Sequence, residues 1–219
     1  RAGRPDHRHL RALGIQMKTA TKLDLGRLHK ADYVTPKQPV LLTLKPAHYL
    51  AISGQGAPGG EQFTACIGAL YGMAFTIKMT RKFAGKQDYT VGKLEGQWFF
   101  DSDPAGLPKV KWRWKLMIRT PDFVTETDRK QAVATLLKRG KPREVEEVKI
   151  ETIDEGRCVQ MLHVDPYEKE CETIALMRVF AEGKGFQLAG PHHEIYLSDP
   201  RRVPPERLKT ILRVPVRKS

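Results

Sequence analysis

The chain has 219 residues, of which 40% are hydrophobic, and carries a formal net charge of +13. This length fits one large domain or two small ones, and the apolar content is sufficient for a buried core. No apolar run approaches the roughly 18 residues of a membrane span, and no secretory signal peptide is recognisable. The three cysteines (Cys66, Cys158 and Cys171) do not suggest a disulfide framework, so we expect a cytoplasmic protein without membrane contact.

Both ends of the chain are basic. Residues 1–16 also lack apolar periodicity, so we expect a disordered basic tail followed by a single domain at 17–219. Such charge leaves nucleic acid open as a partner, but no helix-turn-helix, zinc-finger or RNA-binding motif supports it. We interpret the excess charge as a solvated basic surface.

The first half of the domain predicts two strands, a helix and two further strands. The strands at 40–44 and 48–53 precede a helix from Glu61 to about Phe83, whose apolar residues recur at helical spacing. A strand and turn follow at 89–104. The segment KWRWKLMIR at 111–119 alternates in polarity and predicts a strand. Thr125, with Asp128 three residues later, predicts the start of a linking helix at about 125–140.

The second half repeats this order of elements. Strands at 145–153 and 157–164 flank Asp154-Glu155-Gly156, which predicts a hairpin turn. A helix after residue 165, a strand at 192–197 and a strand at 211–216 follow. The tripeptide Ser-Asp-Pro occurs at both 102–104 and 198–200, which favours a duplication.

The expected fold is therefore α+β, with two β-β-α-β-β repeats related by pseudo-two-fold symmetry. Repeat one would cover about 35–120 and repeat two about 143–217, joined by the linking helix. Antiparallel sheets would carry helices on one face. A concave ligand cleft between the repeats would lie on the other face.

Aromatic residues gather where this cleft is expected. All three tryptophans lie within seventeen residues, and alternation places Trp112 and Trp114 on one face of their strand. Such a face offers a flat apolar surface to a planar ligand, although burial in the core is an alternative for these side chains. Tyr167 and Tyr196 would contribute from the second repeat.

Two glutamates are candidates for acid and base chemistry. Alternation puts His192, Glu194 and Tyr196 on one strand face, where apolar neighbours would raise the pKa of Glu194. Glu170 lies near the start of the second helix and can lean over the same groove. One glutamate could activate water while the other protonates the substrate. The alternatives are a solvated Glu194 and a Glu170 that only complements the helix dipole.

A metal site would need three convergent ligands, for which the candidates are His163, His192, His193 and Glu194. Alternation sends His192 and His193 to opposite faces, so we expect no metal. Cys171 has no evident base beside it, and the GQGAPGG stretch lacks the Lys-Ser/Thr of a phosphate loop.

Four segments resemble the GyrI-like (gyrase-inhibitor-like) small-molecule-binding family over about 35–217: LEGQWFF, KWRWKLMIRTPDFVT, LHVDPYEKECETI and HHEIYLSDPRRVPPERLKTILRVPV. They are most similar to its stand-alone branch of cyclopropanoid cyclopropyl hydrolases. The family implies two SHS2-type repeats and a cleft for planar, aromatic or cationic lipophilic molecules. The hydrolase branch implies that water opens a strained cyclopropane in DNA-alkylating natural products, with neither metal nor organic cofactor. A non-catalytic multidrug- or cation-sequestering protein, and a partner of gyrase or nucleic acid, are the alternatives.

The resemblance also implies roles for particular residues. It makes Glu194, Glu170 and Tyr196 the catalytic candidates. Aromatic and polar side chains are the candidate substrate contacts: Trp98, Trp112, Trp114, Tyr71, Phe123, His163 and Tyr167. The chain departs from the family pattern at Asp165, where glycine is usual before Pro-Tyr, and at Phe99, where a second tryptophan is common. Asp165 bears on the loop that presents Tyr167 and Glu170.

Overall fold

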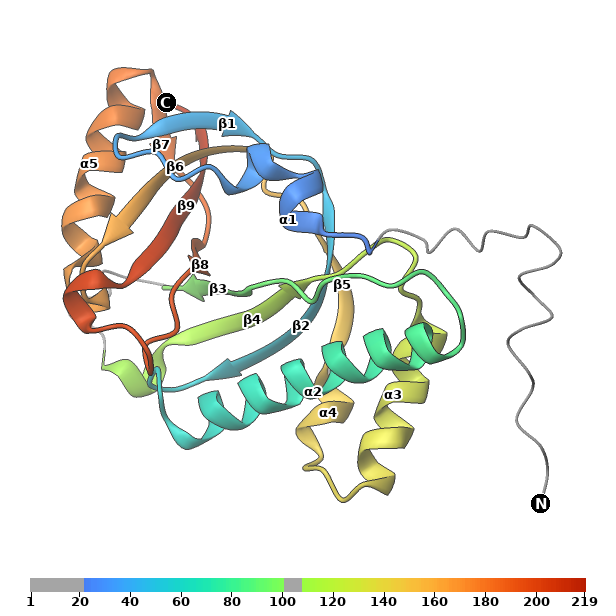
Figure 1. Ribbon diagram of the computed structural model, residues 1–219. Helices are drawn as coiled ribbons and strands as arrows, with labels where there is room; N and C mark the ends of the chain where they lie inside the picture. Colours follow the sequence, from blue (N-terminus) through green and yellow to red (C-terminus); the bar gives the residue numbers. More distant parts are fainter. Residues whose placement is uncertain (1–21, 101–107) are drawn as a thin grey trace, which may run out of the picture.

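The computed structural model describes residues 22–100 and 108–219 (Figure 1). The expected tail and the first Ser-Asp-Pro turn lie outside these residues. The strands are β1 (Val40–Thr43), β2 (Ala47–Gln55), β3 (Leu94–Phe99), β4 (Arg113–Arg119), β5 (Lys149–Ile153), β6 (Arg157–Val164), β7 (Phe186–Leu188), β8 (His192–Tyr196) and β9 (Lys209–Lys218). The helices are α1 (Leu25–Leu28), α2 (Glu61–Phe83), α3 (Glu126–Lys138), α4 (Glu144–Glu147) and α5 (Glu170–Gly183). Short 3-10 turns are η2 (Lys30–Tyr33), η4 (Lys109–Lys111), η5 (Tyr167–Lys169) and η6 (Pro205–Arg207).

The strands form one antiparallel sheet in the order β1-β6-β9-β8-β3-β4-β2-β5, with β7 paired to β9. The predicted α+β class is confirmed. Outward from the central β3–β8 pair, β4 and β9, β2 and β6, and β5 and β1 take equivalent places. This order agrees with the proposed duplication, which itself stays a prediction.

The predicted hairpin between β5 and β6 is wrong. β5 pairs with β2, where Ala47 lies opposite Ile153, and β6 pairs with β1 and β9. Gly156 does adopt a positive φ of 57°, so the turn forms, but it joins β5, at one end of the strand order, to β6, the second strand from the other end. Because three residues span at most about 15 Å between the flanking Cα atoms, the two ends must approach each other and the sheet curls.

Helix α2 packs on β2 and β4 through side chains at helical spacing, among them Phe63, Leu70, Met73 and Ile77. By length and composition alone it could cross a membrane. Helices that pack in a protein core can have the same length and composition, and α2 buries one face against the sheet in this way. Arg81 near its C-terminal end donates to Asp128 of α3 at 2.8 Å.

Helix α3 begins as predicted. The Thr125 hydroxyl accepts from the Asp128 backbone, and the Asp128 carboxylate accepts from the Thr125 backbone, forming a capping box. Helix α3 lies beside α2 (Figure 1), whereas α5 packs on β6 and β7.

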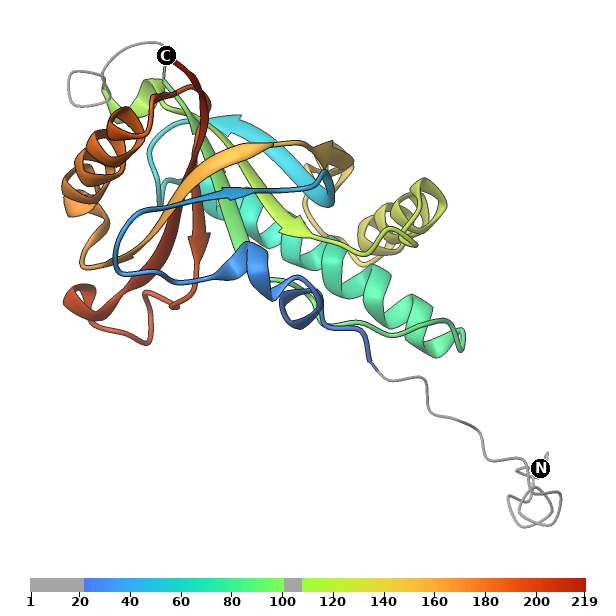
Figure 2. The ribbon, with the colours of Figure 1, turned by 90° about the horizontal axis from the view of Figure 1, so that it is seen from above.

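Helices α2 and α5 lie on one face of the sheet, over different parts of it (Figure 2). Trp98 of β3 stacks on Phe63 of α2 with ring centroids 5.8 Å apart. The opposite face is covered by the N-terminal segment, where Tyr33 donates to Glu95 at 3.0 Å and Asp32 accepts from Arg119 at 2.8 Å.

Candidate functional site

The centre of the candidate site is strand β8, whose side chains alternate as predicted. His192 lies opposite Trp98 of β3, and Glu194 lies opposite Gly96. His192 and Glu194 contact each other on the helix-bearing face. His193 points to the opposite face, where it contacts Glu95 and Glu155.

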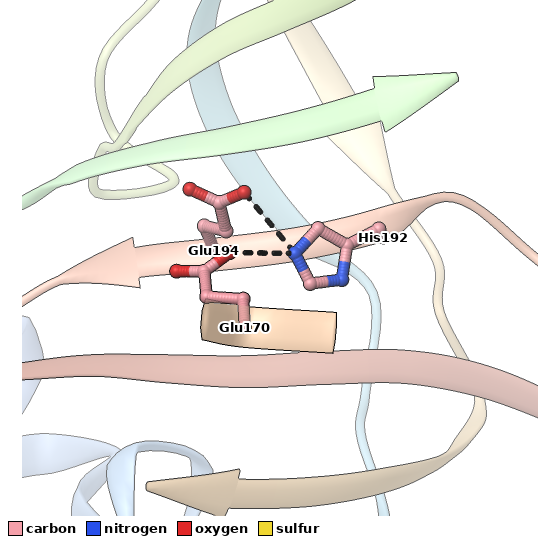
Figure 3. Close-up of side chains that lie close together, drawn as sticks. All are labelled: Glu170, His192 and Glu194. Atoms are coloured by element: carbon pink, nitrogen blue, oxygen red, sulfur yellow. Dashed lines mark hydrogen bonds and ion pairs between the residues drawn. The ribbon is translucent and has the colours of Figure 1, made fainter. Parts of the chain in front are cut away.

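Three side chains converge on this face (Figure 3). The His192 Nε2 atom is 3.1 Å from Glu194 Oε1 and 3.4 Å from Glu170 Oε2. Glu170 is the first residue of α5, so the helix delivers it to β8. Both glutamates are buried. The sequence analysis predicted the two glutamates as site residues but did not predict that His192 bridges them. The position of His192, two residues before Glu194 on the same strand face, was the signal for this contact.

Burial and mutual contact change the protonation of the cluster. Burial, and then the charge of Glu194, raises the pKa of Glu170 to about 8. Burial alone would lower the pKa of His192, but its bonds to Glu170 and Glu194 outweigh that effect and raise it to about 9. At neutral pH Glu170 therefore keeps its proton and His192 is an imidazolium. The cluster therefore holds two proton donors, Glu170 and His192, in contact with the side chain of Glu194.

A reaction that uses Glu170 as its acid is expected to lose rate as pH rises through about 8 to 9. The raised pKa keeps the donor protonated below this window, and both Glu170 and His192 lose protons within it. The measurement is kcat between pH 5 and 10 on the purified protein. A falling limb near 4.5, the ordinary pKa of a glutamate, would contradict this assignment.

Aromatic rings border the cluster. Tyr167 packs edge-on against Tyr196 at 6.0 Å, and Trp98 packs edge-on against Trp112 at 5.8 Å. The rings of Trp112, Tyr167 and Tyr196 are partly exposed. The indole N–H of Trp98 is buried beside the Tyr196 hydroxyl, and the Glu170 carboxyl group lies beside that of Glu194.

Two of the predicted tryptophan contacts differ in accessibility. Trp114 is 1% exposed, and its indole donates to the Gly56 carbonyl at 3.2 Å, beneath Gly54 of β2. It packs in the core under Phe63. Trp112 is the tryptophan with open surface.

The predicted face of the cleft is wrong. We expected it opposite the helices, but Glu170 belongs to α5 and contacts β8 from the helix-bearing face. The opposite face near β8 holds buried charged side chains, including Glu95 and Arg213. The reason is that the two helices lie over different parts of the sheet and leave the central β3–β8 pair between them.

The remaining predicted contacts are distributed. Tyr71 of α2 stacks with Phe75, with ring centroids 6.2 Å apart. The charges of Asp199 and Arg201 also act on the Tyr71 hydroxyl. Phe123 lies under the Arg81 guanidinium, 4.6 Å from its ring centroid.

Phe123 is not brought to the cluster. Arg81, which it contacts, is eighteen residues after Phe63 in α2, and Phe63 is the residue that contacts Trp98. Eighteen residues of helix span about 27 Å. Phe123 and the cluster thus lie near opposite ends of α2.

Gly96 leaves room for the Tyr196 hydroxyl. A Cβ at position 96 would come 3.0 Å from the Tyr196 oxygen and 3.5 Å from its ring. Replacing Gly96 with Ala is expected to shift that hydroxyl by a few tenths of an ångström and to lower kcat to roughly a tenth. Gly183→Ala, where a Cβ meets nothing within 4 Å, is the matched control. Equal kcat in both variants would show that the position of Tyr196 does not matter.

The cluster also has the composition of a metal site, because ligand atoms of Glu170, His192 and Glu194 all lie within 4.8 Å of one another. This set differs from the four candidates considered from the sequence. His163 bonds Thr173 and Pro166 instead, and His193 lies on the other face. A metal could bind here only after His192 gives up its proton, because an imidazolium cannot ligate.

Comparison with known proteins agrees with the fold. Residues 37–217 match the GyrI-like small molecule binding domain. A conserved protein from Listeria innocua is 36% identical, with a TM-score of 0.84, over 90% of this chain and 100% of that one. A hydrolase from Listeria innocua is 35% identical, with a TM-score of 0.83 and the same coverage. The C-terminal domain of EcmrR shares the fold at 11% identity and a TM-score of 0.55, covering 83% of this chain and 98% of that domain. No curated protein matched significantly.

The match covers most of the chain, which therefore belongs to the GyrI-like small-molecule-binding domain family.

Proposed function

We propose that this protein hydrolyses strained cyclopropanes in planar, lipophilic, DNA-alkylating compounds and thereby protects the cell from them. The observation that carries the proposal is a buried pair of glutamates bridged by His192 at a border of aromatic rings. The relationship to a Listeria protein described as a hydrolase is consistent with it.

The proposed reaction uses each group once. Glu194 accepts a proton from water as the water oxygen bonds to a cyclopropane carbon. The strained C–C bond breaks, and its electron pair passes into the conjugated ring system of the substrate. Glu170, which keeps its proton at neutral pH, protonates that ring system. The product contains the substrate plus one water.

His192 completes the cycle. It contacts both carboxyl groups, so it can pass a proton to Glu170 and take one from Glu194. In this proposal the partly exposed side chains of Trp112 and Tyr167 contact the flat surface of the substrate.

The test is to mix the purified protein with a cyclopropane-bearing alkylating agent in ¹⁸O-labelled water. Ring-opened product carrying one ¹⁸O, formed faster than in buffer, supports the proposal. Tryptophan fluorescence in the same samples reports binding. EDTA is expected to leave the rate unchanged, because a protonated His192 bridges the carboxyl groups without a metal. Loss of rate with EDTA and recovery with Zn²⁺ would replace this mechanism with a metal-dependent one.

The alternative function is sequestration of lipophilic aromatic cations without chemistry. Buried carboxyl groups among aromatic rings suit such ligands. A protonated Glu170 and a protonated His192, however, leave little negative charge for a cation to meet. Tight binding of a lipophilic cation with no ring-opened product from the alkylating agent would favour this alternative.

A further inference from the structure

His163 is buried in β6, outside the Glu170–His192–Glu194 cluster, with 4% of its surface exposed. Both of its ring nitrogens have partners. Nε2 lies 3.1 Å from the Pro166 carbonyl oxygen, and Nδ1 lies 2.9 Å from the Thr173 hydroxyl oxygen. A carbonyl can only accept, so Nε2 carries a hydrogen. Nδ1 shares a hydrogen bond with the Thr173 hydroxyl, which can donate or accept.

These two partners flank the residues that reach the site. Pro166 immediately precedes Tyr167, and Thr173 follows Glu170 by one helical turn. The α5 helix has no side-chain cap, since Lys169 at its N-cap makes no capping hydrogen bond. His163 is therefore a buried side chain that ties the start of this helix and the turn before it to the sheet.

His163 lies too far away to join the reaction. It pairs across the sheet with Thr210, which in turn pairs with Tyr196. Two strand spacings place His163 about 10 Å from Tyr196. The sequence analysis expects His163 to contact substrate, but this placement favours a structural role instead.

We propose that His163 is a positioning residue, which holds Tyr167 over Tyr196 and the Glu170 carboxyl against His192 by clamping the segment 166–173. The expected effect of His163 on catalysis rests on the proposed function. The clamp itself does not depend on that function, because it concerns the placement of Glu170 in the free protein.

The experiment measures both consequences. Replacing His163 with Leu removes both hydrogen bonds at similar volume, and Thr173→Val removes one with almost no change in shape. We expect each variant to lower kcat, by about 10- to 100-fold for Leu and less for Val. A ¹³C NMR titration of the Glu170 carboxyl in the free protein should show its pKa falling from about 8 toward 4.5, because the carboxyl is no longer held in its buried place.

Conservative variants separate the two bonds. The amide of His163→Gln reaches the Nε2 position and can still donate to Pro166, so it should recover part of both readouts. His48→Gln, a half-exposed histidine of β2, is the control. An unchanged Glu170 titration in folded Thr173→Val and His163→Leu would overturn the clamp. A raised KM with an unchanged titration would instead make His163 a substrate contact. If the wild-type protein has no hydrolase activity, the NMR result still decides.

Discussion

Glu194→Gln is expected to lower kcat for ring opening by about 10²- to 10⁴-fold, the usual contribution of a general base. The amide is nearly the same size as the carboxylate, and its oxygen can still accept from His192 at the place where Glu194 Oε1 now lies. It cannot take a proton from water. Substrate binding should survive, because Trp112 and Tyr167 are unchanged.

The measurement is single-turnover formation of ring-opened product, with binding followed separately by tryptophan fluorescence. Glu206→Gln, an exposed glutamate of η6, is the matched control and should behave as wild type. Glu170→Gln should also be slow, and its rate should lose the part of the falling limb near pH 8 that depends on the Glu170 proton, leaving the part near pH 9 from His192. Full turnover in Glu194→Gln would remove this residue from the base role.

Local patterns in the sequence predicted what depends on local geometry. Alternation along β8 correctly placed His192, Glu194 and Tyr196 together and sent His193 to the other face. The Thr125 capping signal correctly started α3. These features depend on strand and helix periods, which the residues carry within a few positions.

Strand pairing could not be predicted from such local patterns. Asp154-Glu155-Gly156 has the composition of a hairpin turn, and Gly156 does take a left-handed conformation. Yet β5 pairs with β2 and β6 with β1, because each of these strands buries its apolar residues against a distant segment. The face of the site was wrong for the same reason. Where α5 lies over the sheet, and hence where Glu170 points, is decided by long-range packing.

The bridge made by His192 is an intermediate case. Its shared face with Glu194 could be predicted, but its contact with Glu170 depends on α5 reaching β8. His193 next to it has the side chain of a possible metal ligand, whereas the structure gives it the buried acidic partners Glu95 and Glu155 on the other face.

Those partners belong to a buried network that supports the strand carrying the site. Arg213 of β9 donates to Glu155 at 2.9 Å and to Gln160 at 2.8 Å, and also to the backbone carbonyl of Asp32. Glu155 in turn bonds His193 at 2.8 Å. Burial would raise the pKa of Glu155, but His193 and Arg213 outweigh this and lower it to about 2.

Arg213→Leu is expected to lower the free energy of unfolding by roughly 3–5 kcal/mol, because it leaves a buried carboxylate and two other acceptors without their donor. Arg213→Lys keeps the charge but not the branched donor geometry, and should fall between Leu and wild type. Arg201→Leu removes an exposed arginine paired with Asp199 and should stay near wild type. Urea unfolding followed by circular dichroism measures all three.

The pH dependence gives the same prediction a second check. A carboxyl with a depressed pKa stabilises the folded state above its unfolded pKa of about 4.5, and this stabilisation is lost as pH falls toward 2. The deficit of Arg213→Leu should therefore be largest near neutral pH and shrink below about pH 4.5. An equal deficit at pH 7 and pH 3 would mean that Arg213 acts through packing alone, and no deficit at pH 7 would mean that the network does not stabilise the sheet.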